Sequence, residues 1–152
     1  MKLRKIAVPA LTLTALMLCT AAETDRQGTL YQRLGGQAAV TAVVDDFVTR
    51  ILADNRVNKW FAHAAQDPAR AAAYKQMLGD FVCQAAGGPC KYKGMDMSAA
   101  HKGRGITGEA FDAVVEDLVA TLSKFNVPER EKRDLLALLG PLKAAVVTAE
   151  TK

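Results

Sequence analysis

Two histidines and three cysteines carry the most distinctive side-chain chemistry in this sequence. His101 lies in the stretch "GGPCKYKGMDMSAAHKGRGIT" (87–107), among small and apolar residues and just ahead of two glycines; the other histidine is His63. The sequence contains no Cys-x-x-Cys-His motif, which excludes covalent attachment of a c-type haem. It also contains no His-Glu-x-x-His motif, no Cys/His cluster and no glycine-rich phosphate loop, so neither a zinc site nor a nucleotide site is indicated.

A single imidazole can still hold haem iron when the rest of the site is an apolar slot. The sequence offers side chains for such a slot on several segments: Phe47, Phe61, Tyr74, Leu78, Phe81, Met97 and Ile106. Two other interpretations of His101 stay open. It could be a structural or surface histidine, or it could pair with Cys83 as a nucleophile, although no third residue is placed to orient that pair.

The N-terminus has the order of a secretory signal peptide, which we assign to residues 1–22. Three basic residues come first, an apolar run over 6–18 follows, and small residues occupy 20–22. The apolar run is too short to span a bilayer as a helix, so no membrane span is expected after signal removal. Lipidation at Cys19 and an uncleaved anchor are the alternatives. Cleavage, lipidation and an uncleaved anchor all predict a secreted or periplasmic protein, and lipidation would anchor it to a membrane through Cys19.

The basic character of the chain belongs mainly to that N-terminal segment. The formal net charge is +4, and removing the three basic residues of the segment leaves +1. A nucleic-acid partner is therefore not expected. Cleavage also removes Cys19 and leaves an even pair, Cys83 and Cys90. An oxidising compartment favours a disulfide between them, and two buried free thiols are the alternative.

Helical spacing recurs along the chain, and strand-type alternation does not persist. A short helix is expected over 30–34, and a longer one carries apolar residues at 40, 43, 44, 47 and 51. Asp67 and Pro68 form a helix start, and Gly87-Gly88-Pro89 forms a helix end. Thr107 caps the next helix, and Pro141 is expected to kink the last. We predict one all-α domain over residues 27–149.

These motifs together resemble the group I truncated haemoglobins, the two-over-two helical globins. The resemblance covers about residues 29–148 and rests on motifs in the right order: "LYQRLGG" (30–36), "VVDDF" (43–47), "ILAD" (51–54), "GGP" (87–89), "AHKGRGIT" (100–107) and "GPL" (140–142), with Tyr92, Gly94 and Met97 between the last glycine break and the histidine. It implies the truncated two-over-two fold and a single haem b.

The resemblance also assigns roles to individual residues. It implies that His101 is the proximal iron ligand and that Phe61 packs against the porphyrin. Tyr92, Met97 and Ile106 match positions on the proximal side and at the haem edge, and Phe47 belongs to the same pocket. The cysteine after Gly-Gly-Pro is outside the general pattern, so with Cys83 it is interpreted as an adaptation to an extracytoplasmic setting.

The distal side departs from the family pattern. The family usually places a tyrosine where this sequence has Val48, and a glutamine where it has Leu78. Tyr74, one turn before Leu78 on the same helix face, is then the main hydrogen-bond donor for a bound ligand. Met77 matches a position that supplies an internal sixth ligand in some relatives, and a core role for its flexible side chain is the alternative.

The resemblance implies a protein that reversibly binds diatomic gases, oxygen or nitric oxide. It could instead be an enzyme, a nitric oxide dioxygenase or a peroxidase, which would need an external reductase because the chain contains none. A His/Met electron-transfer protein with a redox partner is the third haem-based alternative. A helical interaction module without haem is the fourth. Carriage of gas is favoured over enzyme activity.

Overall fold

The computed structural model describes residues 28–149 of the chain, all in helices and the segments that join them. In chain order the elements are α1 (Leu30–Arg33), α2 (Gly36–Ala53), η2 (Asn58–Phe61), α3 (Ala62–Ala65), α4 (Pro68–Ala85), α5 (Met97–His101), α6 (Gly108–Lys124), α7 (Glu129–Leu139), η3 (Gly140–Leu142) and α8 (Lys143–Val146). The all-α prediction is confirmed. The predicted signal peptide, Cys19 and residue 27 lie outside the described residues.

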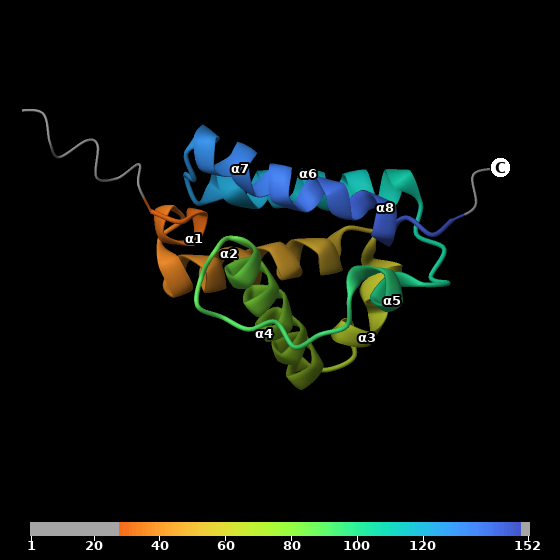
Figure 1. Cartoon of the computed structure of the whole chain (residues 1–152). Helices are drawn as coiled ribbons and strands as arrows, with labels where there is room; N and C mark the ends of the chain where they lie inside the picture. Colours follow the sequence, from red (N-terminus) through yellow and green to blue (C-terminus); the bar gives the residue numbers. More distant parts are fainter. Residues whose placement is uncertain (1–27, 150–152) are drawn as a thin grey trace, which may run out of the picture.

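Two layers of helices make up the fold (Figure 1). α6, α7 and α8 form one layer, and α2 and α4 form the other, with α1 at one end and α3 and α5 at the opposite end. α2 packs against both α4 and α6, so it joins the two layers. The described residues contain no helix long and apolar enough to cross a membrane.

Local sequence signals set the helix boundaries. The Asp67 side chain accepts a hydrogen bond from the Arg70 backbone N–H at 2.8 Å, and Pro68 occupies the first turn of α4. The Thr107 hydroxyl accepts from the Ala110 N–H at 3.2 Å at the start of α6. Each cap satisfies a backbone donor that a helix start leaves free. The predicted caps of α4 and α6 are therefore confirmed.

Proline and glycine end the helices where the sequence predicts it. Gly35 and Gly36 have φ values of 100° and 70°, a left-handed geometry that glycine adopts without steric cost, and they separate α1 from α2. Pro141 cannot donate to a helical hydrogen bond. It lies in η3, which separates α7 from α8, so the last helix is divided in two at this proline rather than only kinked as predicted.

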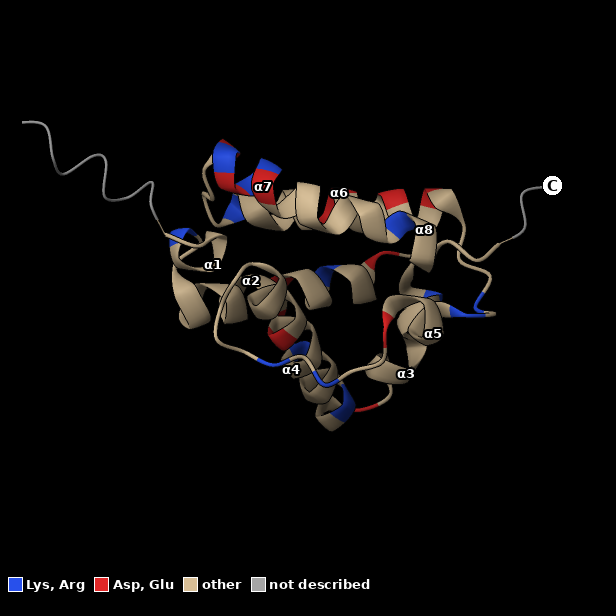
Figure 2. Cartoon of the chain, viewed as in Figure 1, with Lys and Arg blue, Asp and Glu red and all other residues tan. Residues whose placement is uncertain are grey.

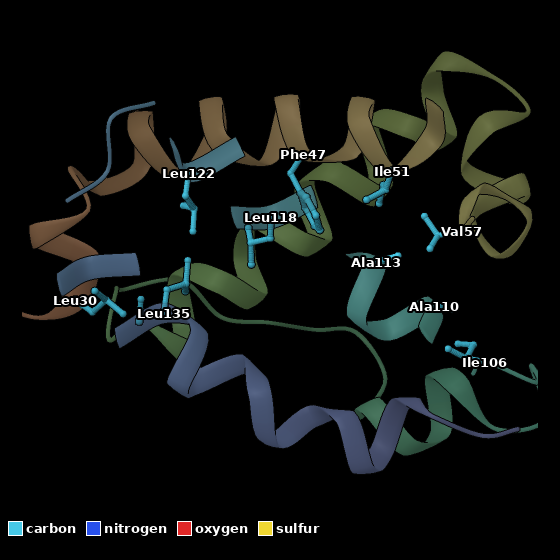
Figure 3. Close-up of a cluster of buried hydrophobic side chains, with 11 residues drawn as sticks. Leu30, Phe47, Ile51, Val57, Ile106, Ala110, Ala113, Leu118, Leu122 and Leu135 are labelled. Atoms are coloured by element: carbon cyan, nitrogen blue, oxygen red, sulfur yellow. The ribbon is translucent and has the colours of Figure 1, made fainter. Parts of the chain in front are cut away.

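The core lies between the two layers. Figure 3 shows Phe47, Leu118 and Leu122 projecting into it from their helices, and the same cluster includes Ile51 and Leu135. At roughly 25 cal/mol per Å² of apolar surface, burying each large side chain contributes about 1.5–3 kcal/mol. The core therefore fixes the relative positions of α2, α6 and α7.

Charged side chains of both signs are spread over the helices, and α7 carries several (Figure 2). Arg33 of α1 donates from Nε to Glu131 of α7 at 3.0 Å and also pairs with Asp134. Glu131 is buried, so this ion pair is shielded from salt more than a surface pair would be. It ties the first described helix to α7.

Candidate functional site

A cavity of about 690 Å³ lies between the two helical layers. That volume is within the usual range for small-molecule and cofactor sites, about 300–1,000 Å³. The cavity brings together every side chain predicted for the haem site: Phe47, Phe61, Tyr74, Met77, Leu78, Tyr92, Met97, His101 and Ile106. These residues belong to six different segments of the chain, and the fold brings the six together around one cavity.

His101 closes the short helix α5. The Asp96 side chain caps this helix by accepting from the Ala99 N–H at 3.0 Å. Within the helix, His101 Nδ1 lies 2.7 Å from the carbonyl oxygen of Met97. Because a carbonyl only accepts, Nδ1 must carry the proton, and in the neutral ring Nε2 then keeps its lone pair. The imidazole is thus held in the tautomer that a metal ligand needs.

The segment after α5 is joined to η2 by a hydrogen bond. Trp60 donates from its indole N–H to the carbonyl oxygen of Arg104 at 3.0 Å. Gly103 and Gly105, on either side of Arg104, have φ values of 71° and 63°. These left-handed conformations turn the chain sharply after His101, so Arg104 reaches the cavity lining.

Tyr74 and Phe61 approach each other at the cavity wall. Their ring centroids are 5.8 Å apart, and the ring planes are tilted by 59°. Burial raises the pKa of Tyr74 to about 12; the nearby Tyr92 hydroxyl adds to the rise, and the Arg104 cation opposes it. Tyr74 therefore keeps its phenolic proton at any physiological pH. Within residues 28–149 we find no protein hydrogen bond from its hydroxyl, so this donor is available to a ligand.

The wall opposite α2 includes the irregular segment between α4 and α5. Cys83 and Cys90 form a disulfide there, with 5.8 Å between their Cα atoms, as predicted. Tyr92 packs edge-on against Phe81 with ring centroids 5.2 Å apart, and its backbone N–H donates to Gln84 Oε1 at 2.8 Å. This segment is therefore fixed to α4 by covalent, aromatic and polar contacts.

Val48 is a correction to the expected distal side. It stands where the family usually places its distal tyrosine, but it is fully buried in a cluster with Val40 and Val44 and is not part of the cavity lining. Its neighbour Phe47 lines the cavity instead. Adjacent residues on a helix point about 100° apart, so only one of them faces a given wall.

The cavity also has a basic rim, and two of its members, His63 and Arg70, were not expected from the sequence. His63, Arg70 and Arg104 line it with exposed side chains, and no acidic side chain of the described residues does so. Arg70 donates from Nη1 to His63 Nδ1 at 3.2 Å, since a guanidinium has no lone pair to accept with. His63 and Arg70 belong to different helices, α3 and α4, so their contact depends on how these helices pack and leaves no signal in the sequence.

The residues present fit a haem. One imidazole offers a free Nε2, the remaining lining is almost entirely apolar, and basic side chains stand only at the rim, where the carboxylates of a porphyrin meet solvent. Lys75 is not part of this set, because its ammonium group lies 3.2 Å from Asp45 on the outer surface of α2 and α4. The described residues contain no group of three or more His, Cys, Asp or Glu side chains that could hold a metal ion alone.

Comparisons with known proteins agree with this geometry. A family model described as bacterial-like globin matches residues 29–148. A group 1 truncated haemoglobin of a Synechocystis species is 42% identical over 116 residues, which cover 74% of this chain and 90% of the relative. A group 1 truncated haemoglobin of Tetrahymena thermophila is 38% identical over 105 residues, covering 69% of this chain and 83% of the relative.

Two solved structures resemble the fold. The truncated haemoglobin of Tetrahymena pyriformis in its Fe(III) form superposes with a TM-score of 0.72 at 30% identity, covering 80% of this chain and 99% of that one. A two-over-two haemoglobin of a Synechococcus species, in the cyanomet state with covalently attached haem, gives a TM-score of 0.70 at 36% identity, covering 79% of this chain and 98% of that one.

Proposed function

Because this chain belongs to the group 1 truncated haemoglobins, which are haem-binding globins, we propose that it holds a single haem b through His101 and reversibly binds diatomic gases, oxygen or nitric oxide. The observation that carries the proposal is the hydrogen bond from His101 Nδ1 to the Met97 carbonyl, inside an apolar cavity. It leaves Nε2 as the only unprotonated imidazole nitrogen of this residue. Haem iron supplies the gas-binding and redox chemistry when it is bound.

The remaining contacts of this proposal come from the cavity lining. Phe61 supports the flat porphyrin, and Met97 and Ile106 close its edges. Arg104 stands at the rim within reach of its carboxylates. Tyr74 donates a hydrogen bond to a ligand that carries partial negative charge. A neutral hydrogen bond of this kind stabilises by about 1 kcal/mol. Leu78, where the family has a glutamine, offers no second donor, so Tyr74 acts alone.

The test is a haem titration followed by spectra of the ferrous protein with and without oxygen. We expect a Soret band at one haem per chain, and an oxygen spectrum that reverses when oxygen is removed. The matched variant is His101→Gly, which should lose the proximal bond and regain it when imidazole is added. A variant that keeps unaltered axial coordination without added imidazole would contradict the assignment of His101.

A second candidate function rests on Met77. Its side chain lines the same cavity as His101 and is 40% exposed, so neighbouring side chains do not fully enclose this flexible thioether. A thioether there would give His/Met coordination and suit electron transfer with a redox partner. A six-coordinate ferrous spectrum that becomes five-coordinate in Met77→Leu supports this function; a five-coordinate spectrum in the unmodified protein rules it out.

We also propose an extracytoplasmic location. The Cys83–Cys90 disulfide supports it, because such bonds persist mainly in oxidising compartments. The order of basic, apolar and small residues over 1–22 supports it independently. Cell fractionation with a C-terminal tag tests the location, and mass spectrometry of the mature N-terminus distinguishes cleavage after residue 21 or 22 from lipidation at Cys19. Recovery of the full-length chain in the cytoplasm would contradict it.

A further inference from the structure

The Cys83–Cys90 disulfide joins α4 to the segment that leads from α4 to His101. Cys83 belongs to the last turns of α4, whose preceding residues Leu78, Phe81 and Val82 line the cavity. Cys90 belongs to residues 86–96, which contain no helix and connect α4 to α5. The bond therefore joins one wall of the cavity to the chain that builds the next.

That connecting segment is itself part of the cavity. Tyr92 and Met95 line it, and the Tyr92 hydroxyl donates to the Met95 carbonyl at 2.9 Å, which holds the two together. Beyond the disulfide, Tyr92 is attached to α4 only by its contact with Phe81 and by the hydrogen bond to Gln84. Gln84 is exposed, so water competes for that bond. Of the attachments between this segment and α4, the disulfide is the covalent one.

The segment continues directly into the helix that carries the imidazole. Asp96 caps α5, and the next residue, Met97, supplies the carbonyl that fixes His101 Nδ1. α5 has five residues and buries none of them. A helix this short has little stability of its own, so its position depends on the segments at either end. The disulfide secures the end that precedes His101.

The two sulfur atoms differ in access. Cys83 is 0% exposed, whereas Cys90 is partly exposed in the connecting segment. The partial exposure of Cys90 favours attack of an incoming thiolate there rather than at the buried Cys83, although Cys90 Sγ also lies 3.4 Å from Gln37 Oε1. We infer that Cys90 is a site of thiol–disulfide exchange with external dithiols, and that opening the bond there loosens the hold of the cavity on haem. This inference rests on the proposed haem function.

The exchange balances without any further reactant. One thiolate of the dithiol attacks Cys90 Sγ, the Cys83–Cys90 bond breaks, and Cys83 leaves as a thiolate that takes up a proton. The second thiolate of the dithiol then attacks the mixed disulfide and releases Cys90, which is also protonated. Two electrons pass to the cysteine pair, and the dithiol becomes a cyclic disulfide.

Release of the bond leaves residues 86–88 held by backbone hydrogen bonds, from the Gly88 N–H to the Cys83 carbonyl and from the Tyr31 N–H to the Ala86 carbonyl, but it removes the covalent restraint on residues 89–96. Tyr92 and Met95 then no longer form a fixed wall, and the start of α5 loses its covalent support. The protein would accordingly retain haem tightly in an oxidising medium and give it up faster in a reducing one. A reducing or oxidising medium thus changes how firmly α5, the helix with His101, is held, because the chain runs directly from Cys90 to the start of α5.

The test starts from the haem-loaded protein. Haem transfer to an excess of a haem-free scavenging globin is timed with and without dithiothreitol. We expect transfer to be at least threefold faster after reduction. We also expect the iron–histidine stretching frequency of the ferrous protein to shift, since loosening α5 changes the setting of the imidazole. A smaller acceleration, or an unshifted frequency, overturns the inference.

The control is the double variant Cys83→Ser/Cys90→Ser. Without dithiothreitol it should transfer haem as fast as the reduced protein, and dithiothreitol should not change its rate. An equal acceleration of the variant by dithiothreitol would overturn the inference, because the effect would then bypass the disulfide. If the variant does not fold, the comparison of oxidised and reduced unmodified protein, with helix content followed by circular dichroism, still decides the matter.

A second measurement tests the site of attack. Glutathione, a monothiol, forms a mixed disulfide in the first step; acid quenching before a second glutathione displaces it preserves the adduct, and mass spectrometry locates it. We expect the adduct on Cys90; an adduct on Cys83 overturns the assignment. Failure of this inference is distinct from failure of the proposed function. A missing Soret band removes haem binding itself, whereas a normal Soret band with an unchanged transfer rate removes only the redox control.

Discussion

The indole N–H of Trp60 donates to the backbone carbonyl of Arg104 at 3.0 Å and so joins η2 to the turn that follows His101. The two residues are 44 positions apart in the chain. Both line the cavity, and Phe61 follows Trp60 directly. This one hydrogen bond therefore links the segment that carries Phe61 to the segment that carries the imidazole.

Trp60→Phe should weaken that link and destabilise the protein. The Arg104 carbonyl loses its donor, and a single neutral hydrogen bond contributes about 1 kcal/mol to the free energy of unfolding. Urea unfolding followed by circular dichroism measures the change. Lys59→Ala is the control, because Lys59 only lies 4.2 Å over the Trp60 ring at an exposed site. A loss in the control as large as in Trp60→Phe would show that the hydrogen bond is not the cause.

Tyr74→Phe should accelerate oxygen dissociation about fivefold, since about 1 kcal/mol of hydrogen bonding to the ligand is lost. Flash photolysis or stopped-flow mixing of the ferrous protein measures the rate. Because burial raises the pKa of Tyr74 to about 12, the rate in the unmodified protein should not change between pH 6 and pH 9.

Tyr92→Phe is the matched control for that measurement. Its hydroxyl faces the same cavity but already donates to the Met95 carbonyl, so it has no proton to offer a ligand. We expect its oxygen dissociation rate to stay within twofold of the unmodified protein. A larger effect in Tyr92→Phe than in Tyr74→Phe would reassign the distal donor.

The double variant Cys83→Ser/Cys90→Ser should lose about 2 kcal/mol of unfolding free energy in the chain-entropy description of a short loop. The crosslinked residues are seven positions apart, which keeps the loss at the lower end of the range for native disulfides. The urea midpoint should fall while the slope of the transition stays constant. An unchanged midpoint in fully oxidised and variant proteins would show that the bond does not stabilise the native state.

Asp117→Asn should stabilise the protein at neutral pH. Burial raises the pKa of Asp117, the neighbouring Asp54 carboxylate raises it further, and one of its carboxylate oxygens has no partner. For a carboxyl group whose folded pKa is raised, the stabilising contribution is present at low pH. It is lost as pH rises from the unfolded pKa through the folded one. The asparagine amide carries no charge at any of these pH values, so the variant does not lose stability as pH rises to 7.

Thermal melts of Asp117→Asn and the unmodified protein at pH 4 and pH 7 measure this difference. The two proteins should differ more at pH 7 than at pH 4, with the variant melting at the higher temperature. Asp112→Asn is the control, because Asp112 is exposed and paired with Lys143. An Asp117→Asn variant that melts lower at pH 7 would mean that the charge is needed.

The helices could be predicted because their boundaries depend on neighbours in the sequence. Asp67, Thr107 and Pro141 each act within a turn of their own position, through a cap or a missing N–H, so no tertiary information is required. His101 could be singled out for a related reason. It is one of two histidines in the sequence, and Gly103 and Gly105 predict a turn directly after it.

Other features depend on packing between elements and could not be predicted. Helical periodicity identifies an apolar face around Phe47 and Val48, but the face is wide enough for both. Only the position of α4 and α6 decides which one borders a cavity. The rim of His63 and Arg70 arises because α3 folds back on α4. Asp117 and Thr121 are the polar residues among the buried residues of α6, and α2 packs against this helix.

The Gly-Gly-Pro turn after α4 limits which residues can stand beside the crosslink. A Cβ atom at position 88 would lie 2.6 Å from the Cys83 sulfur and 2.8 Å from the Cys83 carbonyl oxygen. Any residue with a side chain at that position would push the two cysteines apart. A relative of this chain could therefore acquire the same bond only on a background that already had glycine at that turn.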